Sequence, residues 1–445
     1  MAPVRILVFP DSGPRIGGGH AMRCLTLARA LIARGATCAF AATPSTQVIL
    51  RAFGAPGIEV FPVSPDPDEA AAGAAHWAAS FDADWVLLDH YFLNPEQEAA
   101  LRVGRRLAVL DDLAERPRVA DLVMDSAYGR TAGAYRPLLP PGAVILAGPA
   151  YAPVRPEFAA HRAASLLHRR EGGHLRHVLI SLGLTDVEGI TERVVGILRP
   201  MLGGLILDVA MGSAAPSLAA LCAAAKSDPH LRLHVDSHEM AQLMAAADIA
   251  VGAGGSSTWE RATLGLPTTT VVLADNQRPM AQAMAQDGLT LTADVGADSF
   301  EDDLIGALHK LIGDAVLRRA MSEKAAATCD GLGAERVAEA LLRPQQIDRQ
   351  EAGATNPIRS SRSAIAGRTS AHSRASSPSP STSCAWPALT TWARKRASCW
   401  KPNFWCSRQT ASLEASTSHH SLRRPSPFPS GRGGPNACSI IQYST

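Results

Sequence analysis

A histidine at the end of a glycine loop is the residue of this sequence best placed to do chemistry. An apolar stretch ends at Asp11, Gly17, Gly18 and Gly19 follow, and His20 stands where a helical pattern begins. The first turn of a helix has unpaired N–H groups and favours negative charge, so phosphate-bearing ligands bind at such joins. An imidazole can also take a proton from water near neutral pH. The position predicts either a structural histidine or a general base beside an anion site.

Two more glycine loops follow strand-like stretches, SLGLTD at 181–186 and GAGGSSTWE at 252–260. Spacing alone leaves two interpretations of the second loop open. It is an ordinary helix capping box, or its serines and helix start hold a pyrophosphate while the glutamate accepts hydrogen bonds from ribose. The candidate ligand-binding residues of the two loops are Gly183, Thr185, Asp186, Gly254, Gly255, Ser256, Ser257 and Glu260.

Acidic and aromatic residues end two further strand-like stretches. Asp89, His90 and Tyr91 close the stretch WVLLDHY, and Asp111 and Asp112 close RLAVLDD. Side chains at the carboxyl ends of parallel strands reach the ligand sites of α/β proteins. The simpler interpretation of the paired aspartates is a helix cap or a salt bridge. No carboxylate cluster has metal-ligand spacing, so neither a metal nor a cofactor is predicted.

The elements that must position these residues alternate between strand and helix patterns, which predicts an α/β fold with parallel sheets. In the helix expected over 21–34, Arg23, Thr26 and Arg34 lie away from the apolar stripe. We expect two Rossmann-like domains facing a cleft, over 1–152 and 174–344, joined by a polar linker over 153–173. The first predicted strand starts at residue 5. The further strands are predicted over 37–43, 58–63, 85–91, 106–112, 121–127, 143–149, 177–183, 204–212, 231–236, 248–255 and 268–275.

The charge of the chain is divided between an acidic body and a basic tail. The 94 residues from Ala352 contain 12 Lys or Arg and one acid, whereas residues 1–351 contain 31 basic and 40 acidic residues. The acidic body argues against nucleic acid as its main partner. The low-complexity tail over 345–445 is either a disordered basic segment, a nucleic-acid arm, or the product of a shifted reading frame, as its four tryptophans and four cysteines suggest.

The N-terminal stretch has no apolar core of signal-peptide length, and no apolar run approaches the length of a membrane span. A cytoplasmic protein is therefore expected. The four cysteines of the body, Cys24, Cys38, Cys222 and Cys329, have no paired spacing. They are expected to be reduced thiols.

Taken together and in order, several motifs resemble the UDP-sugar hydrolases of pseudaminic acid biosynthesis. The resemblance covers residues 4–290 and none of the tail. The matching pieces are Asp11 followed by IGGGHAMRCLTLA at 16–28, LLDHY at 87–91, LDD at 110–112, LAGPAYAPVRPEF at 146–158, SLGLTD at 181–186 and GGSSTWERATLG at 254–265.

This resemblance implies a fold similar to the two-domain GT-B glycosyltransferases. It also implies metal-independent attack of water at the anomeric carbon of a UDP-linked 2,4-diacetamido-2,4,6-trideoxyhexose, with inversion. His20 would activate or orient the water, Tyr91 would help to place it, and the second domain would bind UDP. At Leu184 the sequence departs from the Gly-Gly-Thr-Asp expected of the family. The expected substrate-binding residues are Asp11, Gly17, Gly18, Gly19, Asp89, His90, Gly183, Thr185, Asp186, Gly254, Gly255, Ser256, Ser257, Glu260, Asn276 and Gln277.

Two alternatives remain open from the sequence. A GT-B glycosyltransferase would use the same residues but carry the sugar to an acceptor, and a non-catalytic protein would only bind the nucleotide sugar. The oligomeric state is not predicted.

Overall fold

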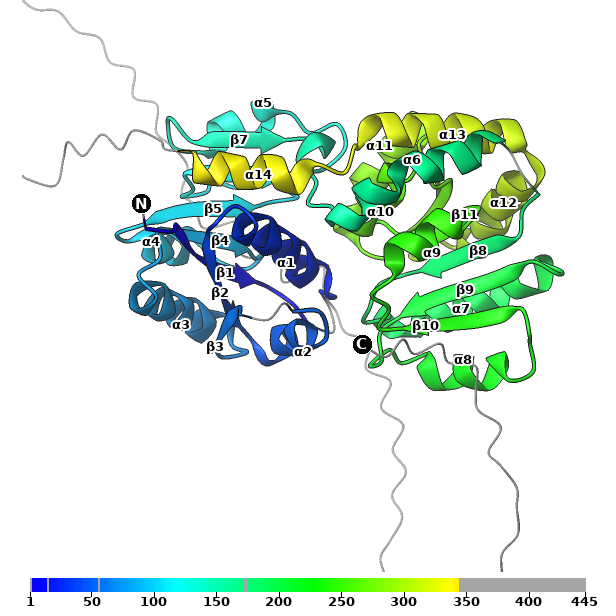
Figure 1. Ribbon diagram of the computed structural model, residues 1–445, viewed down its shortest axis with the longest axis horizontal. Coiled ribbons are helices and arrows are strands. Elements are labelled where there is room, and N and C mark those ends of the chain that lie inside the picture. The colour runs from blue at the N-terminus through cyan, green and yellow to red at the C-terminus, as the bar shows by residue number, and fades with distance from the viewer. Residues whose placement is uncertain (1, 14–15, 55–56, 172–173, 344–445) are drawn as a thin grey trace, which may run out of the picture. The chain divides into compact units, whose positions relative to one another are not determined.

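Two parallel β-sheets with helices on both faces make up the protein in a computed structural model that describes residues 2–13, 16–54, 57–171 and 174–343 (Figure 1). The predicted α/β fold with two Rossmann-like sheets is thereby confirmed. The predicted tail over 345–445 lies outside the described residues. Within the described ranges, no helix is both long and apolar enough to cross a membrane.

The first sheet has the strand order β3-β2-β1-β4-β5-β6-β7, with all neighbours parallel. The order changes direction between β1 and β4, which is where ligands of such sheets bind, outside the carboxyl ends of the strands. The central strands are apolar along their length because helices cover both faces. The strands are β1 (Arg5–Pro10), β2 (Thr37–Ala42), β3 (Glu59–Pro62), β4 (Trp85–Asp89), β5 (Arg106–Leu110), β6 (Leu122–Asp125) and β7 (Val144–Ala147).

The second sheet repeats this arrangement in the order β10-β9-β8-β11-β12-β13, and its change of direction lies between β8 and β11. Strand β13 is absent from the prediction, because its four residues LTAD lack an apolar run. The strands are β8 (His177–Ser181), β9 (Ile206–Met211), β10 (Leu231–Val235), β11 (Ile249–Ala253), β12 (Thr268–Val272) and β13 (Leu291–Asp294).

Helices bury apolar side chains on both faces of each sheet. On the first sheet, one face is covered by α1 (Gly19–Ile32), α2 (Pro44–Phe53) and α14 (Gly333–Leu342), and the other by α3 (Pro67–Ser80), α4 (Pro95–Arg102) and α5 (Ala132–Tyr135). On the second sheet, one face is covered by α7 (Ile190–Leu198), α8 (Leu218–Ala225) and α12 (Phe300–Gly313). The other is covered by α6 (Pro156–Glu171), α9 (Met240–Ala246), α10 (Ser257–Thr263), α11 (Arg278–Gln286) and α13 (Ala315–Thr328).

Helix α14 packs on the first sheet, although it lies inside the range 174–344 that the sequence assigned to the second domain. Its buried residues Val337, Ala338 and Leu341 join the core that contains Leu31 of α1. Figure 1 shows α14 beside α1, the last described helix against the first. An apolar stripe on a helix does not identify the surface that it covers, so the sequence could not assign α14 to the first sheet.

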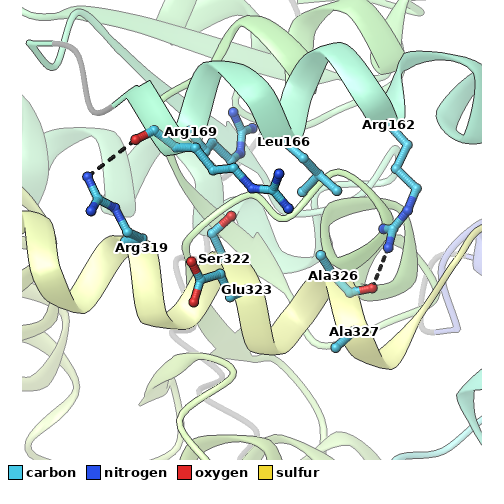
Figure 2. Close-up of a pocket in the computed structure, with 9 residues that line it drawn as sticks. Arg162, Leu166, Arg169, Arg319, Ser322, Glu323, Ala326 and Ala327 are labelled. Carbon is cyan, nitrogen blue, oxygen red and sulfur yellow. Dashed lines mark hydrogen bonds between the residues drawn. The ribbon is translucent and has the colours of Figure 1, made fainter.

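Helix α6 replaces most of the polar linker expected over 153–173, which is a correction to the sequence analysis. Two of its arginines, Arg162 and Arg169, donate to backbone carbonyls of neighbouring elements. Arg162 donates to the carbonyls of Ala326 (2.6 Å) and Cys329 (3.1 Å), and Arg169 donates to those of Gly265 and Met244, both at 2.9 Å. Figure 2 shows Arg162 reaching from α6 to the backbone of Ala326 on α13. Because these half-buried arginines are polar in the sequence, the pattern resembled an exposed connection.

Candidate active site

His20 lies in the first turn of α1, and its ring is held from one side by the end of β4. Its Nδ1 atom lies 3.1 Å from Oδ1 of Asp89, which is fully buried, and only 7% of His20 is exposed. The Tyr91 ring meets the imidazole edge to face, with ring centroids 4.7 Å apart. Nδ1 also lies 3.4 Å from the backbone carbonyl oxygen of Asp89. Carboxylate and carbonyl oxygens both only accept, so Nδ1 carries the hydrogen and the lone pair is left on Nε2. The imidazole is thereby oriented as a base.

Arg23, one helical turn after His20, binds two carboxylates at once. Its Nε and Nη2 donate to the two oxygens of Asp89 at 2.6 and 2.7 Å, and its Nη1 and Nη2 donate to those of Asp112 at 2.9 and 3.0 Å. The helical pattern predicts that Arg23 and Thr26 lie away from the apolar stripe of α1. Both are instead buried, with 8% and 5% of their surface exposed. The carboxylates explain how a guanidinium can be buried there.

The hydroxyl of Tyr91 donates to Oδ2 of Asp112 at 2.7 Å. Burial alone would raise the pKa of the Asp112 carboxyl, but the charge and hydrogen bonds of Arg23 outweigh burial and lower that pKa to about 2. Burial and the charge of Asp112 raise the pKa of Tyr91, so the phenol keeps its proton. The amide of Asn276, which precedes α11 in the second half of the chain, donates to the Tyr91 oxygen at 3.2 Å.

Asp11 and His90 form a second buried pair at the same strand ends. Oδ2 of Asp11 lies 3.7 Å from Nε2 of His90, and within the described residues no hydrogen bond reaches that oxygen. Nδ1 of His90 accepts from the backbone N–H of Phe92 at 3.2 Å. Burial lowers the pKa of His90, more than the nearby carboxylates raise it. His90 is therefore neutral near pH 7, and its Nδ1 faces the backbone of the loop that follows β4.

The glycine loop at 17–19 faces two loops of the second half of the chain. A β-carbon placed on Gly17 would lie 3.6 Å from Oγ1 of Thr185, and one on Gly19 would lie 3.6 Å from Oγ of Ser256. One placed on Gly18 would lie 3.7 Å from Leu184, the position where the sequence departs from the family pattern. The three glycine loops predicted from sequence are therefore brought together.

A buried arginine lies beneath the loop that leads into α10. Arg261 is 2% exposed, and its hydrogen bonds go to the carbonyl of Ala253 (2.7 Å) and to the hydroxyls of Ser257 (3.0 Å) and Thr258 (3.2 Å). All three acceptors are neutral, and burial lowers the pKa of Arg261 to about 10. Gly252 is required here because a β-carbon would lie 2.5 Å from the guanidinium. The loop is thus built over a cation.

Glu260 is held by a residue that the sequence analysis did not single out. Its Oε1 accepts from Nε of Arg155 at 2.9 Å, and the Arg155 guanidinium lies 4.9 Å from the centre of the Phe158 ring. Among the described contacts of α10, Ser256 at its N-terminus makes no side-chain capping bond. The capping-box interpretation therefore does not account for Ser256 and Glu260.

Other predicted ligand-binding residues have structural partners. The carboxylate of Asp186 is fully buried and accepts from the backbone N–H groups of Thr191 (2.8 Å) and Ser217 (3.1 Å). Gln277 accepts from the N–H of Leu273 at 3.1 Å and lies against Gly254. The Asp89 carboxylate is enclosed by Arg23 and His20, so it supports the site from behind. Gly183 is exposed and has a φ of 110°, which a side chain would strain.

Asp111 and Asp112 are adjacent in sequence but bind different partners. Asp111 is 1% exposed and pairs with Arg118 at 3.1 Å, which agrees with the salt-bridge interpretation. Asp112 instead joins the network of Arg23 and Tyr91. No group of three or more His, Cys, Asp or Glu residues suited to a metal ion occurs within the ranges that the structure describes.

Comparison with known proteins finds distant relatives, and the chain spans 58% of the length of the first of them. No family model matches the sequence. The chain is 27% identical over 199 residues to the spore coat polysaccharide biosynthesis protein SpsG of Bacillus subtilis, covering 44% of this chain and 58% of SpsG. It is 22% identical over 287 residues to the UDP-2,4-diacetamido-2,4,6-trideoxy-beta-L-altropyranose hydrolase of Campylobacter jejuni, covering 64% of this chain and 97% of that enzyme. The resemblance predicted from the motifs is confirmed.

Solved structures confirm the GT-B-like fold. MurG of Acinetobacter baumannii matches with a TM-score of 0.54 and 17% identity, over 76% of this chain and 99% of MurG. The S. aureus MnaA–UDP co-structure matches with a TM-score of 0.54 and 13% identity, over 77% of this chain and 96% of MnaA. The spinosyn rhamnosyltransferase SpnG, complexed with thymidine diphosphate, matches with a TM-score of 0.52 and 17% identity, over 76% of this chain and 100% of SpnG. At these identities the likeness concerns the fold alone.

Proposed function

We propose that this chain hydrolyses a UDP-linked 2,4-diacetamido-2,4,6-trideoxyhexose to the free sugar and UDP, as a step of pseudaminic acid biosynthesis. The observation that carries the proposal is the pair of His20 and Asp89, which leaves the Nε2 lone pair of a buried imidazole available as a base. The distant likeness to the Campylobacter jejuni hydrolase supports the choice of sugar.

In the proposed reaction, the oxygen of water forms a bond to the anomeric carbon from the face opposite UDP. The bond from that carbon to the UDP oxygen breaks, UDP leaves with the electron pair, and the configuration inverts. His20 takes the proton that water loses. UDP is already a stable anion, so its departure needs little help from an acid. Positioning one water and its base is the main task of the site.

The diphosphate would lie at the loop of Gly254, Gly255, Ser256 and Ser257. Arg261 beneath this loop is a buried cation with only neutral hydrogen-bond acceptors, so an anion above the loop would be attracted to it. The free edge of Glu260, held by Arg155, would accept hydrogen bonds from the ribose hydroxyls. Asn276, which contacts Tyr91, would lie between the sugar and the nucleotide.

The test is to incubate the protein with a panel of UDP-sugars and no acceptor, in water enriched in heavy oxygen. Free sugar carrying the label and unlabelled UDP are expected. Release of UDP only after an acceptor is added would identify a transferase, and label in UDP would mean attack at phosphorus. Tight UDP binding without turnover of any UDP-sugar would identify a non-catalytic binder.

Replacing His20 tests its role directly. His20→Asn should lower kcat by about 100- to 10,000-fold, the contribution typical of a general base, while leaving UDP affinity nearly unchanged. His309→Asn, on the exposed side of α12, is the matched control and should keep wild-type turnover. Loss of UDP binding in His20→Asn would instead make His20 a contact of the nucleotide.

A further inference from the structure

Arg23 connects His20 and Tyr91, the two side chains that would hold the attacking water in the proposed reaction. Through Asp89 it reaches His20, and through Asp112 it reaches Tyr91. A guanidinium has five N–H donors in a rigid plane and no acceptor, so the four short bonds to the carboxylates fix both acids in place. The same guanidinium therefore binds the carboxylates of Asp89 and Asp112.

An ionised carboxylate can only accept hydrogen bonds, and this determines where each neighbouring proton lies. Both the carboxylate and the backbone carbonyl of Asp89 lie near Nδ1 of His20, so His20 must present Nδ1–H to them, which leaves Nε2 as an acceptor. Toward Asp112, Tyr91 must present its O–H, which leaves only lone pairs on the other side of the phenol oxygen. The Asn276 amide donates to one of these lone pairs, in agreement with this direction.

The two acceptors belong to rings that meet edge to face at the strand ends, with ring centroids 4.7 Å apart. Water has two hydrogens and can donate one to each acceptor. When both hydrogens are taken, a lone pair of the water oxygen points away from the protein, toward the place where a sugar carbon would lie. If Tyr91 donated its proton instead, it would occupy that lone pair and oppose attack.

We propose that Arg23 is a positioning residue that makes both His20 and Tyr91 hydrogen-bond acceptors for the attacking water. The proposal rests on the hydrolysis proposed above, and it assigns Arg23, Asp89 and Asp112 no contact with the substrate.

The chain contains a matched control for Arg23. Arg118 is also buried and also bridges two carboxylates, Glu98 at 2.7 Å and Asp111 at 3.1 Å, but neither of these holds His20 or Tyr91. Replacing either arginine by lysine keeps the charge and loses the planar fork. The two variants should lose stability in the same way, so a difference in turnover reports on positioning.

The expected result for Arg23→Lys is a fall in kcat of about 100-fold with little change in KM or in UDP affinity, because the substrate contacts remain. Arg118→Lys should keep the wild-type kcat. Thermal melting of both variants identifies any variant that does not fold. If Arg23→Lys does not fold, Asp112→Asn takes its place, because the asparagine amide can donate to the Tyr91 oxygen and so reverse the hydrogen bond between these two side chains. Equal kcat values in the Arg23 and Arg118 variants would overturn the proposal.

Nitrogen-15 NMR of the wild-type imidazoles tests the proton arrangement without turnover, with His20→Asn identifying the His20 signals. Protonated Nδ1 and unprotonated Nε2 are expected, and the opposite tautomer would overturn the proposal. If the wild type hydrolyses no UDP-sugar, the proposed function fails while this measurement still decides the proton arrangement.

Discussion

Acid should remove a defined part of the folding free energy through Asp112. The ordinary pKa of the aspartate is 3.8, and the Arg23 pair, outweighing burial, lowers it to about 2 in the folded protein. A carboxylate with a lowered pKa stabilises the fold fully above its unfolded value, and this stabilisation is lost as the pH falls through the folded value. The difference of about 2 pH units corresponds to about 2 kcal/mol. The loss is expected between about pH 5 and pH 2.

Urea denaturation at a series of pH values from 7 to 3 measures this loss. Because Asp112→Asn cannot titrate at this position, the gap in free energy of unfolding between wild type and variant should narrow by about 1 kcal/mol over that range. Asp275→Asn is the control. Its carboxylate pairs with Arg278 on the surface and is 94% exposed. The difference in free energy of unfolding between this variant and wild type should therefore stay constant over the same pH range.

Parallel curves for wild type and Asp112→Asn would refute this reasoning. They would mean that Asp112 has the same pKa in the folded and unfolded chain, and hence that Arg23 does not hold it as the distances of 2.9 and 3.0 Å indicate.

Two further predictions concern the core. Leu341→Ala should lower the free energy of unfolding by about 2–5 kcal/mol, because this 2%-exposed side chain of α14 fills the core against α1, whereas Glu339→Ala on the exposed face should unfold in urea like wild type. Burial raises the pKa of the Cys38 thiol to about 12 and also raises those of Cys24 and Cys329. These three thiols should therefore resist alkylation by iodoacetamide in the native protein at pH 8 and react after unfolding, and peptide mass mapping measures the label at each cysteine. Rapid labelling of Cys38 in the native protein would contradict its burial.

The sequence was sufficient to predict the two sheets and the strand ends that carry the site. Alternating apolar runs and helical stripes are local patterns, and the carboxyl ends of parallel strands meet at one edge, so His20, Asp89 and Tyr91 could be expected near one another. The glycine loops were recognisable for the same reason, since glycine occurs where backbones approach closely.

The supporting residues could not be predicted, because their partners are distant in sequence. Arg23 and Arg155 contact acids 66 and 105 residues away, and no periodicity connects such pairs. A charged residue on a helix is usually assigned to the solvent face, so Arg23 and the arginines of α6 appeared exposed. Asp186 appeared to be a ligand because a side chain that caps the backbone has the same composition signal as one that binds a substrate.

The return of α14 to the first sheet has a consequence for the order in which the protein is completed. Helix α1 is synthesised long before the residues that cover one of its apolar sides, 333–342, which form the last described helix. Domains generally fold from the N-terminus during synthesis. Here the earlier half must wait, with an uncovered apolar surface, until the later half has been synthesised. A nascent chain halted before residue 333 should consequently be a better client for chaperones than one halted after 342.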